Sequence, residues 1–199
     1  LDFDDVMNLQ REIVYGLRND VLTTEDTRKL VHEIIGESAA AGVRQYLSDC
    51  DPLDPDFGPL AQWVREAFGV QVNPEELQNI EDDILEKVRA AYDHRVGGVP
   101  AEILEQDERR AMLVAIDARW QEHLADMDEL REGVYLRSQG QKDPLVEYKN
   151  EAYGLFTVLM ESIKQDAMAY LLRSSAALEK HFGSHQISRA PARTAGVAD

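Results

Sequence analysis

The feature that most constrains this fold is a long stretch without proline, residues 101–136, in which Gly133 is the only glycine. Apolar side chains recur along it at steps of three and four residues or their multiples: Leu104, Met112, Ile116, Trp120, Leu124, Met127, Leu130 and Val134. This spacing places them on one face of an α-helix. At 1.5 Å per residue, ~35 residues form a rod about 50 Å long.

A second long helix is predicted directly after this one. Gly140 breaks the chain, and Asp143 and Pro144 restart it as an N-cap and a first helical residue. A second apolar stripe follows, made of Tyr148, Ala152, Leu155, Phe156, Leu159, Ile163 and Tyr170. The two stripes predict an antiparallel hairpin of two long helices.

The rest of the chain also reads as helix. Residues 1–22 carry apolar side chains at helical spacing, and prolines in "CDPLDPDFGP" separate a second helix from a third. Local signals predict helix starts at Thr23 or Thr24, at Pro59 and at Asn73-Pro74, and a helix stop at Gly69. The segment "FGVQVN" is too short to found a sheet, so the predicted class is all-α.

Composition and charge limit the classes of function that this chain can have. Thirty-eight acidic against 21 basic residues give a formal charge of −17, which disfavours general binding to nucleic acid or anionic lipid. The single cysteine, Cys50, cannot form an internal disulfide, and no apolar run is long enough to span a membrane. We expect a cytoplasmic protein. Because Leu1 lies within a helical pattern, we also expect a piece of a longer polypeptide.

Catalytic and metal motifs are incomplete. "HEIIG" begins like the zinc motif HExxH, but Gly36 stands where the second histidine is needed, and no histidine follows a carboxylate at the Glu-x-x-His spacing. His181 and His185 are one helical turn apart, but Gly183 between them favours an unstructured pair. No glycine-rich phosphate loop occurs. We predict no catalytic, cofactor-binding or metal-binding residues.

Three stretches together resemble a known family. They are "DFDDVMNLQREIVYGLRNDVL" near the start, "ARWQEHLADMDELREGVYLR" at 118–137 and "GQKDPLVEYKNEAYGLFTVLMESIK" at 140–164. They resemble, in order, the C-terminal half of SecA, the motor ATPase family of bacterial protein export. The resemblance implies the end of a long scaffold helix at 1–32, a helical wing at 33–99 and a two-helix finger with its return helix at 100–177. Residues 178–199 are mostly small and polar with little to bury, so we expect a flexible tail there.

The resemblance also implies roles for particular residues. In the family, the finger tip enters the SecY channel and contacts the translocating preprotein, and the matching residues here are Arg137, Ser138, Gln139, Gly140, Gln141 and Lys142. The family often has a bulky residue, commonly tyrosine, where this chain has Gln139. Trp120 matches a family tryptophan whose packing is thought to communicate with the ATPase. We expect finger-packing or regulatory roles for Trp120, Leu124, Met127 and Phe156.

By the same resemblance, this segment is non-catalytic, because ATP and Mg²⁺ bind motor domains of the parent chain that are not in this sequence. The implied partners are SecY, the preprotein and those motor domains, with no nucleic acid. The implied location is cytoplasmic, peripheral at the inner face of the plasma membrane and without a transmembrane segment. Two alternatives are an independent helical adaptor that docks in a partner's groove and a helical enzyme.

Overall fold

A computed structural model describes residues 2–51, 53, 55–137 and 143–187, and the structural statements below refer to these residues. They form six α-helices, one 3-10 turn and no strands, which confirms the all-α prediction. The helices are α1 (Asp2–Thr23), α2 (Thr27–Asp49), α3 (Gly58–Phe68), α4 (Ile80–Val96), α5 (Ala101–Arg137) and α6 (Pro144–Ile187), and the 3-10 turn η1 is Pro74–Glu76.

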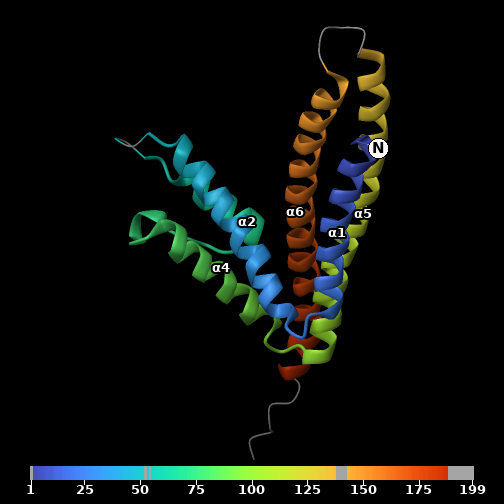
Figure 1. Ribbon diagram of the computed structural model, residues 1–199. Coiled ribbons are helices and arrows are strands. Elements are labelled where there is room, and N and C mark those ends of the chain that lie inside the picture. The colour runs from blue at the N-terminus through green and yellow to red at the C-terminus, as the bar shows by residue number, and fades with distance from the viewer. Residues whose placement is uncertain (1, 52, 54, 138–142, 188–199) are drawn as a thin grey trace, which may run out of the picture.

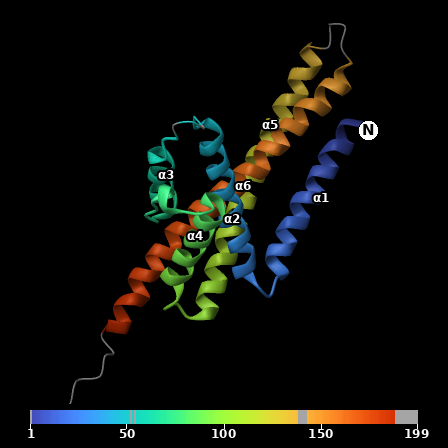
Figure 2. The ribbon, with the colours of Figure 1, turned by 90° about the vertical axis from the view of Figure 1, so that its left-hand side faces the viewer.

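Helices α1, α5 and α6 run side by side as a bundle (Figures 1 and 2). The predicted hairpin of two long helices is confirmed by α5 and α6, which pack against each other along the bundle (Figure 2). Helix α1 lies antiparallel to α5, because Asp4 lies beside Arg131 and Arg18 lies beside Asp117. The sequence predicts the two arms but not this third helix beside them.

Helices α2, α3 and α4 form a smaller unit that branches from one end of the bundle (Figure 1). Gly42 allows α3 to approach α2 closely, because a Cβ at this position would overlap the ring of Trp63. Helix α2 crosses the expected boundary between residues 32 and 33 without a break. The branch point therefore lies earlier, in the turn between α1 and α2.

Two predicted helix starts are wrong. Helix α2 begins after Asp26, whose carboxylate accepts from the Lys29 amide at 3.0 Å, whereas Thr23 is still in α1 and its hydroxyl donates to the Asn19 carbonyl. Asn73 and Pro74 start only the 3-10 turn. Helix α4 begins later, where Asp83 accepts hydrogen bonds from the amides of residues 78 and 79. In both cases a carboxylate further along the chain caps the first turn instead.

Other predicted helix ends are confirmed. Pro59 lies in the first turn of α3, and Gly69 ends that helix with a positive φ of 71°, a conformation that glycine adopts without strain. Pro144 is the first residue of α6, and Asp143 accepts from the Leu145 amide at 2.9 Å. These ends are determined locally, which is why sequence alone predicts them.

The predicted tail from residue 178 is wrong for its first part, because α6 continues to Ile187. The extra turns are held by packing: Leu178 and Phe182 are partly buried against the core, and Arg95 of α4 lies 3.7 Å from Glu179. Residues 188–199 lie outside the described part of the chain.

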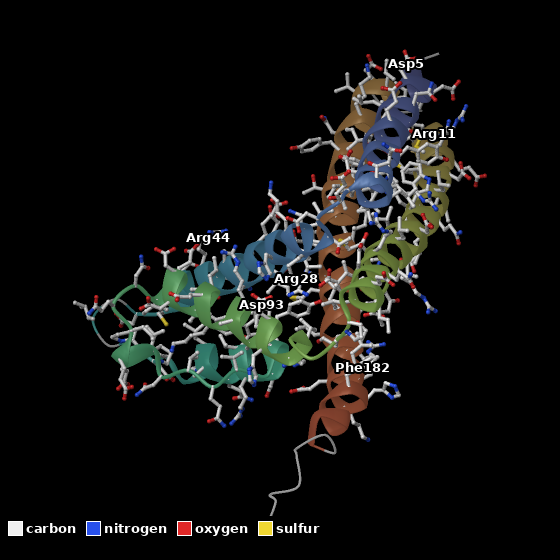
Figure 3. The ribbon with its side chains drawn as sticks, turned by 90° about the horizontal axis from the view of Figure 1, so that it is seen from below. Asp5, Arg11, Arg28, Arg44, Asp93 and Phe182 are labelled. Carbon is white, nitrogen blue, oxygen red and sulfur yellow. The ribbon has the colours of Figure 1, made fainter. Side chains whose placement is uncertain are left out.

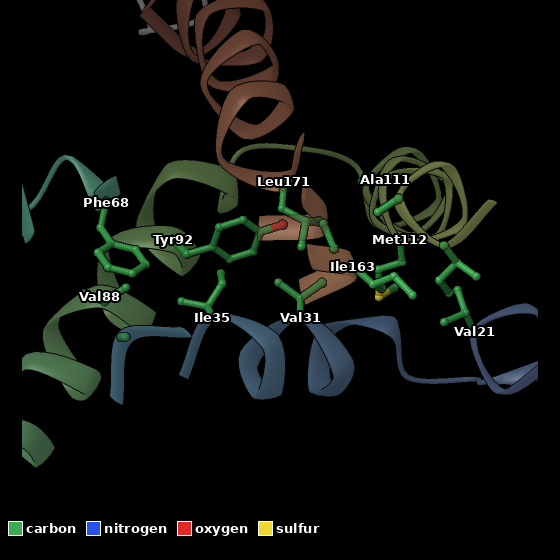
Figure 4. Packing of buried hydrophobic residues seen from close by; sticks show 14 of the residues in the cluster. Val21, Val31, Ile35, Phe68, Val88, Tyr92, Ala111, Met112, Ile163 and Leu171 are labelled. Carbon is green, nitrogen blue, oxygen red and sulfur yellow. The ribbon is translucent and has the colours of Figure 1, made fainter. Parts of the chain in front are cut away.

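The main hydrophobic core contains buried side chains from all six α-helices. Figure 4 shows Val31 and Ile35 of α2 facing Tyr92 of α4 and Leu171 of α6, with Met112 of α5 beside them. All five side chains are buried to within 2% of full burial. The branching unit and the bundle therefore share one core at this end of the molecule.

Candidate functional site

The predicted finger tip falls at the far end of the hairpin. Arg137 is the last residue of α5, and Asp143 and Pro144 begin α6. Ser138, Gln139, Gly140, Gln141 and Lys142 lie outside the described residues, so their role in contacting a partner stays a prediction.

Trp120 lies at the interface of the bundle helices with 7% of its surface exposed. The sequence predicts that it packs against the return arm, but its nearest aromatic neighbours are Tyr15 of α1, edge-on at 6.4 Å between ring centres, and His123 of α5, at 5.6 Å. Tyr15 itself is half exposed. Trp120 therefore connects the hairpin to α1, which the sequence does not indicate.

The other three predicted packing residues, Leu124, Met127 and Phe156, pack in two different clusters. Leu124 and Phe156 are partly buried against the main core, and the Phe156 ring meets the His123 ring edge-on at 6.1 Å. Met127 is buried in a second, smaller cluster nearer the tip. The structure thus packs Trp120, Leu124 and Phe156 in the main core and Met127 in the smaller cluster, whereas a regulatory role for the four stays a prediction.

A buried hydrogen-bonded pair links the three bundle helices at this level. The Gln10 side-chain amide of α1 donates to the Ala152 carbonyl of α6 at 3.2 Å, and its oxygen lies 2.9 Å from Nε2 of His123 on α5. Because the Ala152 carbonyl can only accept, the Gln10 oxygen must face His123, and Nε2 carries the proton. Burial lowers the pKa of His123, an effect that nearby Asp126 partly opposes, so the ring is neutral at neutral pH.

A second polar cluster stands where the branching unit leaves the bundle. Its centre is Glu108 of α5, which is only 1% exposed. Its carboxylate accepts from the Thr27 hydroxyl at 2.6 Å, from Nε of Arg28 at 2.8 Å and from the Tyr92 hydroxyl at 3.1 Å. Burial, with the nearby charge of Glu108, raises the pKa of Tyr92, so its hydroxyl stays a donor.

Arg28 extends this cluster to α4. Its Nη1 donates to Asp93 at 2.7 Å, and Nε2 of His32 lies 2.9 Å from the same carboxylate oxygen. Figure 3 shows Arg28 and Asp93 facing each other at the inner end of the branch, with Arg44 further out. The cluster therefore joins α2, α4 and α5.

Arg109, the next residue of α5, holds the other side of the α1–α2 turn. Its guanidinium donates to the carbonyls of Val21 at 2.5 Å, Leu22 at 2.7 Å and Thr24 at 3.0 Å. These carbonyls lie at the end of α1, where helix carbonyls lack partners and the helix dipole is negative. Glu108 faces the beginning of α2, where the dipole is positive. We call Glu108 and Arg109, with the turn they hold, the elbow clamp.

These polar residues were missed as site candidates, although the sequence carries a signal for them. Glu108 lies one helical turn from both Leu104 and Met112, on the apolar stripe of α5, and His123 lies between Trp120 and Met127 on the same stripe. A polar side chain on an apolar face is either buried with a partner or breaks the pattern. The stripe alone does not say which.

No group of three or more His, Cys, Asp or Glu side chains in the described ranges could hold a metal ion. Among the helices of residues 2–137 and 143–187, none has the length and apolar character that a membrane crossing requires. A small apolar groove of about 180 Å³, edged by Glu33, Glu37 and Lys164, lies between α1, α2 and the hairpin.

The geometry defines a class of protein, a helical scaffold in which a long hairpin and a third helix beside it form a bundle and a small helical unit branches from a charged turn. Comparison with known proteins agrees, since residues 1–175 match the model of the SecA wing and scaffold domain. The chain belongs to the SecA family.

Curated relatives in this family are called protein translocase subunit SecA. The chain is 34% identical to the one from Streptomyces coelicolor over 192 residues, which covers 90% of the chain and 20% of that relative. It is 38% identical over 181 residues to those from Solibacter usitatus and Pelotomaculum thermopropionicum, covering 86% and 87% of the chain. The chain thus spans about a fifth of the length of these relatives.

Proposed function

We propose that this chain is the scaffold, wing and two-helix finger of a SecA-type protein-export motor, and that it carries movement of the motor to the exported polypeptide. In this proposal α1 is the end of the scaffold helix, the unit of α2, α3 and α4 is the wing, and α5 with α6 is the finger with its return helix. The boundary expected at residue 32 thereby moves to the α1–α2 turn. The proposal is supported by membership of the SecA family and by the hairpin itself.

The observation that carries the proposal is that α1 contacts the hairpin along most of the length of α1. Near the tip, the rings of Phe3 and Tyr148 lie 4.5 Å apart, and at the base Arg109 holds the end of α1. Between them, Arg18 pairs with Asp117 at 2.8 Å. A displacement of α1 therefore acts on both hairpin arms through side chains already in contact.

The motor itself is proposed to lie outside this chain, in domains of the same parent polypeptide that bind ATP and Mg²⁺. The segment is then non-catalytic, and its partners are those domains, the SecY channel and the translocating preprotein. It works in the cytoplasm, at the inner face of the plasma membrane, where the channel recruits it. We expect the purified 199-residue chain to release no phosphate from ATP above the buffer rate, and measurable hydrolysis would contradict this assignment.

The tip is proposed to contact SecY and the preprotein with residues 137–142. A photo-crosslinking side chain in place of Gln139, in the complete motor engaged with SecY and an arrested preprotein, should form adducts with one or both. The same group at Leu53, which is 94% exposed in the branching unit, serves as a control for random encounter. If position 139 gives no more adduct than position 53, the tip assignment is wrong.

A further inference from the structure

The buried side chains of the bundle fall into two separate clusters. The larger one fills the base and the branch point, and in the bundle it reaches as far as Trp120 and Leu159. The smaller one lies nearer the tip, and among the side chains that the structure describes it contains Met127, Leu130, Val134, Tyr148 and Ala152. From α1, Phe3 and Val6 pack against this smaller cluster, and Met7 packs against both clusters. We call the two parts the base unit and the outer unit.

The Gln10–His123 pair lies at the boundary between these units. His123 lies between Trp120 of the base unit and Met127 of the outer unit on α5. On α1, Gln10 lies between Val6, which packs against the outer cluster, and Val14 of the base cluster. Gln10 is 5% exposed and His123 is 3% exposed. With the Ala152 carbonyl they form a polar layer that crosses all three helices.

A polar layer inside a helical bundle has two physical effects. Its hydrogen bonds can form in only one register of the helices, so it selects that register over shifted ones. A polar layer also holds the helices together less strongly than an apolar layer at the same position. When the helices separate, its groups form equally good hydrogen bonds to water.

Two ion pairs between bundle helices, one in each unit, differ in distance and exposure. In the base unit, Arg119 of α5 binds Asp166 of α6 through two hydrogen bonds, at 2.7 and 3.0 Å. In the outer unit, Arg131 and Asp4 are 3.6 Å apart and half exposed, a distance and exposure at which an ion pair contributes little. Of these two ion pairs, the one in the outer unit is the weaker contact.

We propose that the Gln10–His123 layer is a separation point, at which the outer unit opens independently of the base unit and recloses in a single register. This property belongs to the bundle itself and does not depend on the proposed export role. In the hairpin it would let the tip-bearing half change its packing while the elbow clamp and the branching unit stay in place.

The proposal is tested by hydrogen exchange of the whole chain, read by mass spectrometry at several low urea concentrations. Amides at 127–134 and 148–152 should exchange together, with a smaller urea dependence than amides at 108–120 and 159–171. The change should occur as a step across residues 123 and 152. A smooth gradient from the tip to the base would mean ordinary fraying of the helix ends, and equal exchange on both sides would mean one unit. Either result would overturn the proposal.

A double variant tests the layer directly. Replacing both partners, Gln10→Leu with His123→Leu, leaves no polar group unpaired on a side chain and should join the two apolar clusters. We expect exchange of the outer amides to slow at least tenfold, with the base amides little changed. The matched control is Met127→Leu, which keeps the polar layer and should retain the step. Unchanged exchange of the outer amides in the double variant would contradict the inference, and if that variant does not fold, the step in the unmodified chain decides.

Discussion

The elbow clamp and the Gln10–His123 layer are both buried polar contacts between helices, but one is charged and the other is neutral. At the clamp, separating the helices would leave the Glu108 carboxylate without Arg28, Thr27 and Tyr92. At the layer, separation exposes an amide and a neutral imidazole, which water satisfies readily. The comparison indicates that the branch point is the fixed part of this scaffold and the outer hairpin is the part that can move.

The largest expected effect comes from the tryptophan that joins the base unit to α1. Trp120→Ala should lower the free energy of unfolding by about 3–5 kcal/mol, because a large ring that is 7% exposed leaves a cavity. Urea denaturation followed by circular dichroism measures the change. Tyr153→Ala, at a ring that is 74% exposed on α6, is the control and should change stability by no more than about 0.5 kcal/mol. An unchanged midpoint for Trp120→Ala would mean that the ring serves an external partner.

A direct test of the clamp is Glu108→Gln. The neutral amide keeps the shape but turns its NH₂ group toward a donor, so we expect a loss of about 1.5–3 kcal/mol in the free energy of unfolding. Glu122→Gln is the control, because Glu122 pairs with Arg119 at an exposed position on the same helix. If both variants have the same stability, the clamp is no stronger than a surface ion pair and the comparison fails.

The neutral layer should respond to pH. Because the pKa of His123 is lower in the folded chain than its ordinary value of about 6.5, the unfolded chain binds the proton first as pH falls. Above pH about 6.5 the contribution of His123 to the free energy of unfolding should therefore not change with pH. As pH falls from 6.5 toward the lowered pKa, the free energy of unfolding should decrease. Unfolding measured between pH 7.5 and pH 5 should show a steeper decrease in the unmodified chain than in His123→Gln. If stability depends on pH in the same way in both chains, folding does not lower the pKa of His123.

The smallest expected effect is at the start of α6. Asp143→Ala removes the acceptor of the Leu145 amide and should cost about 1 kcal/mol. Hydrogen exchange should locate the loss in the first turn of α6, inside the outer unit. The control is Glu161→Ala at an exposed position within the same helix, which should leave that turn unchanged. Spread of the effect to the base unit would contradict the separation of the two units.

Much of the fold follows from local patterns. The two arms of the hairpin, the proline and glycine ends of α3 and the restart at Asp143 were predicted because periodicity and capping depend on residues within a few positions of one another. The start of α4 was wrong for the complementary reason: Asn73 and Pro74 form a good local signal, but Asp83 supplies acceptors for amides 78 and 79 and places the helix start there.

The candidate site shows a similar division. The packing residues Trp120, Leu124, Met127 and Phe156 were named from their stripes and from the resemblance. The structure packs three of them in the main core and Met127 in the smaller cluster. Their neighbours Gln10 and His123 come from positions 113 residues apart, and no pattern within one helix pairs them.

The sequence by itself determined that this chain is all-helical, where most of its long helices run and that a polar residue at position 108 interrupts an apolar face. Only the tertiary structure decided what that residue does, because the partner Thr27 is 81 positions away and reaches Glu108 only when α1 turns back into α2 beside α5. Helical periodicity is a local property of the backbone, whereas the pairing of buried charges depends on which helices meet.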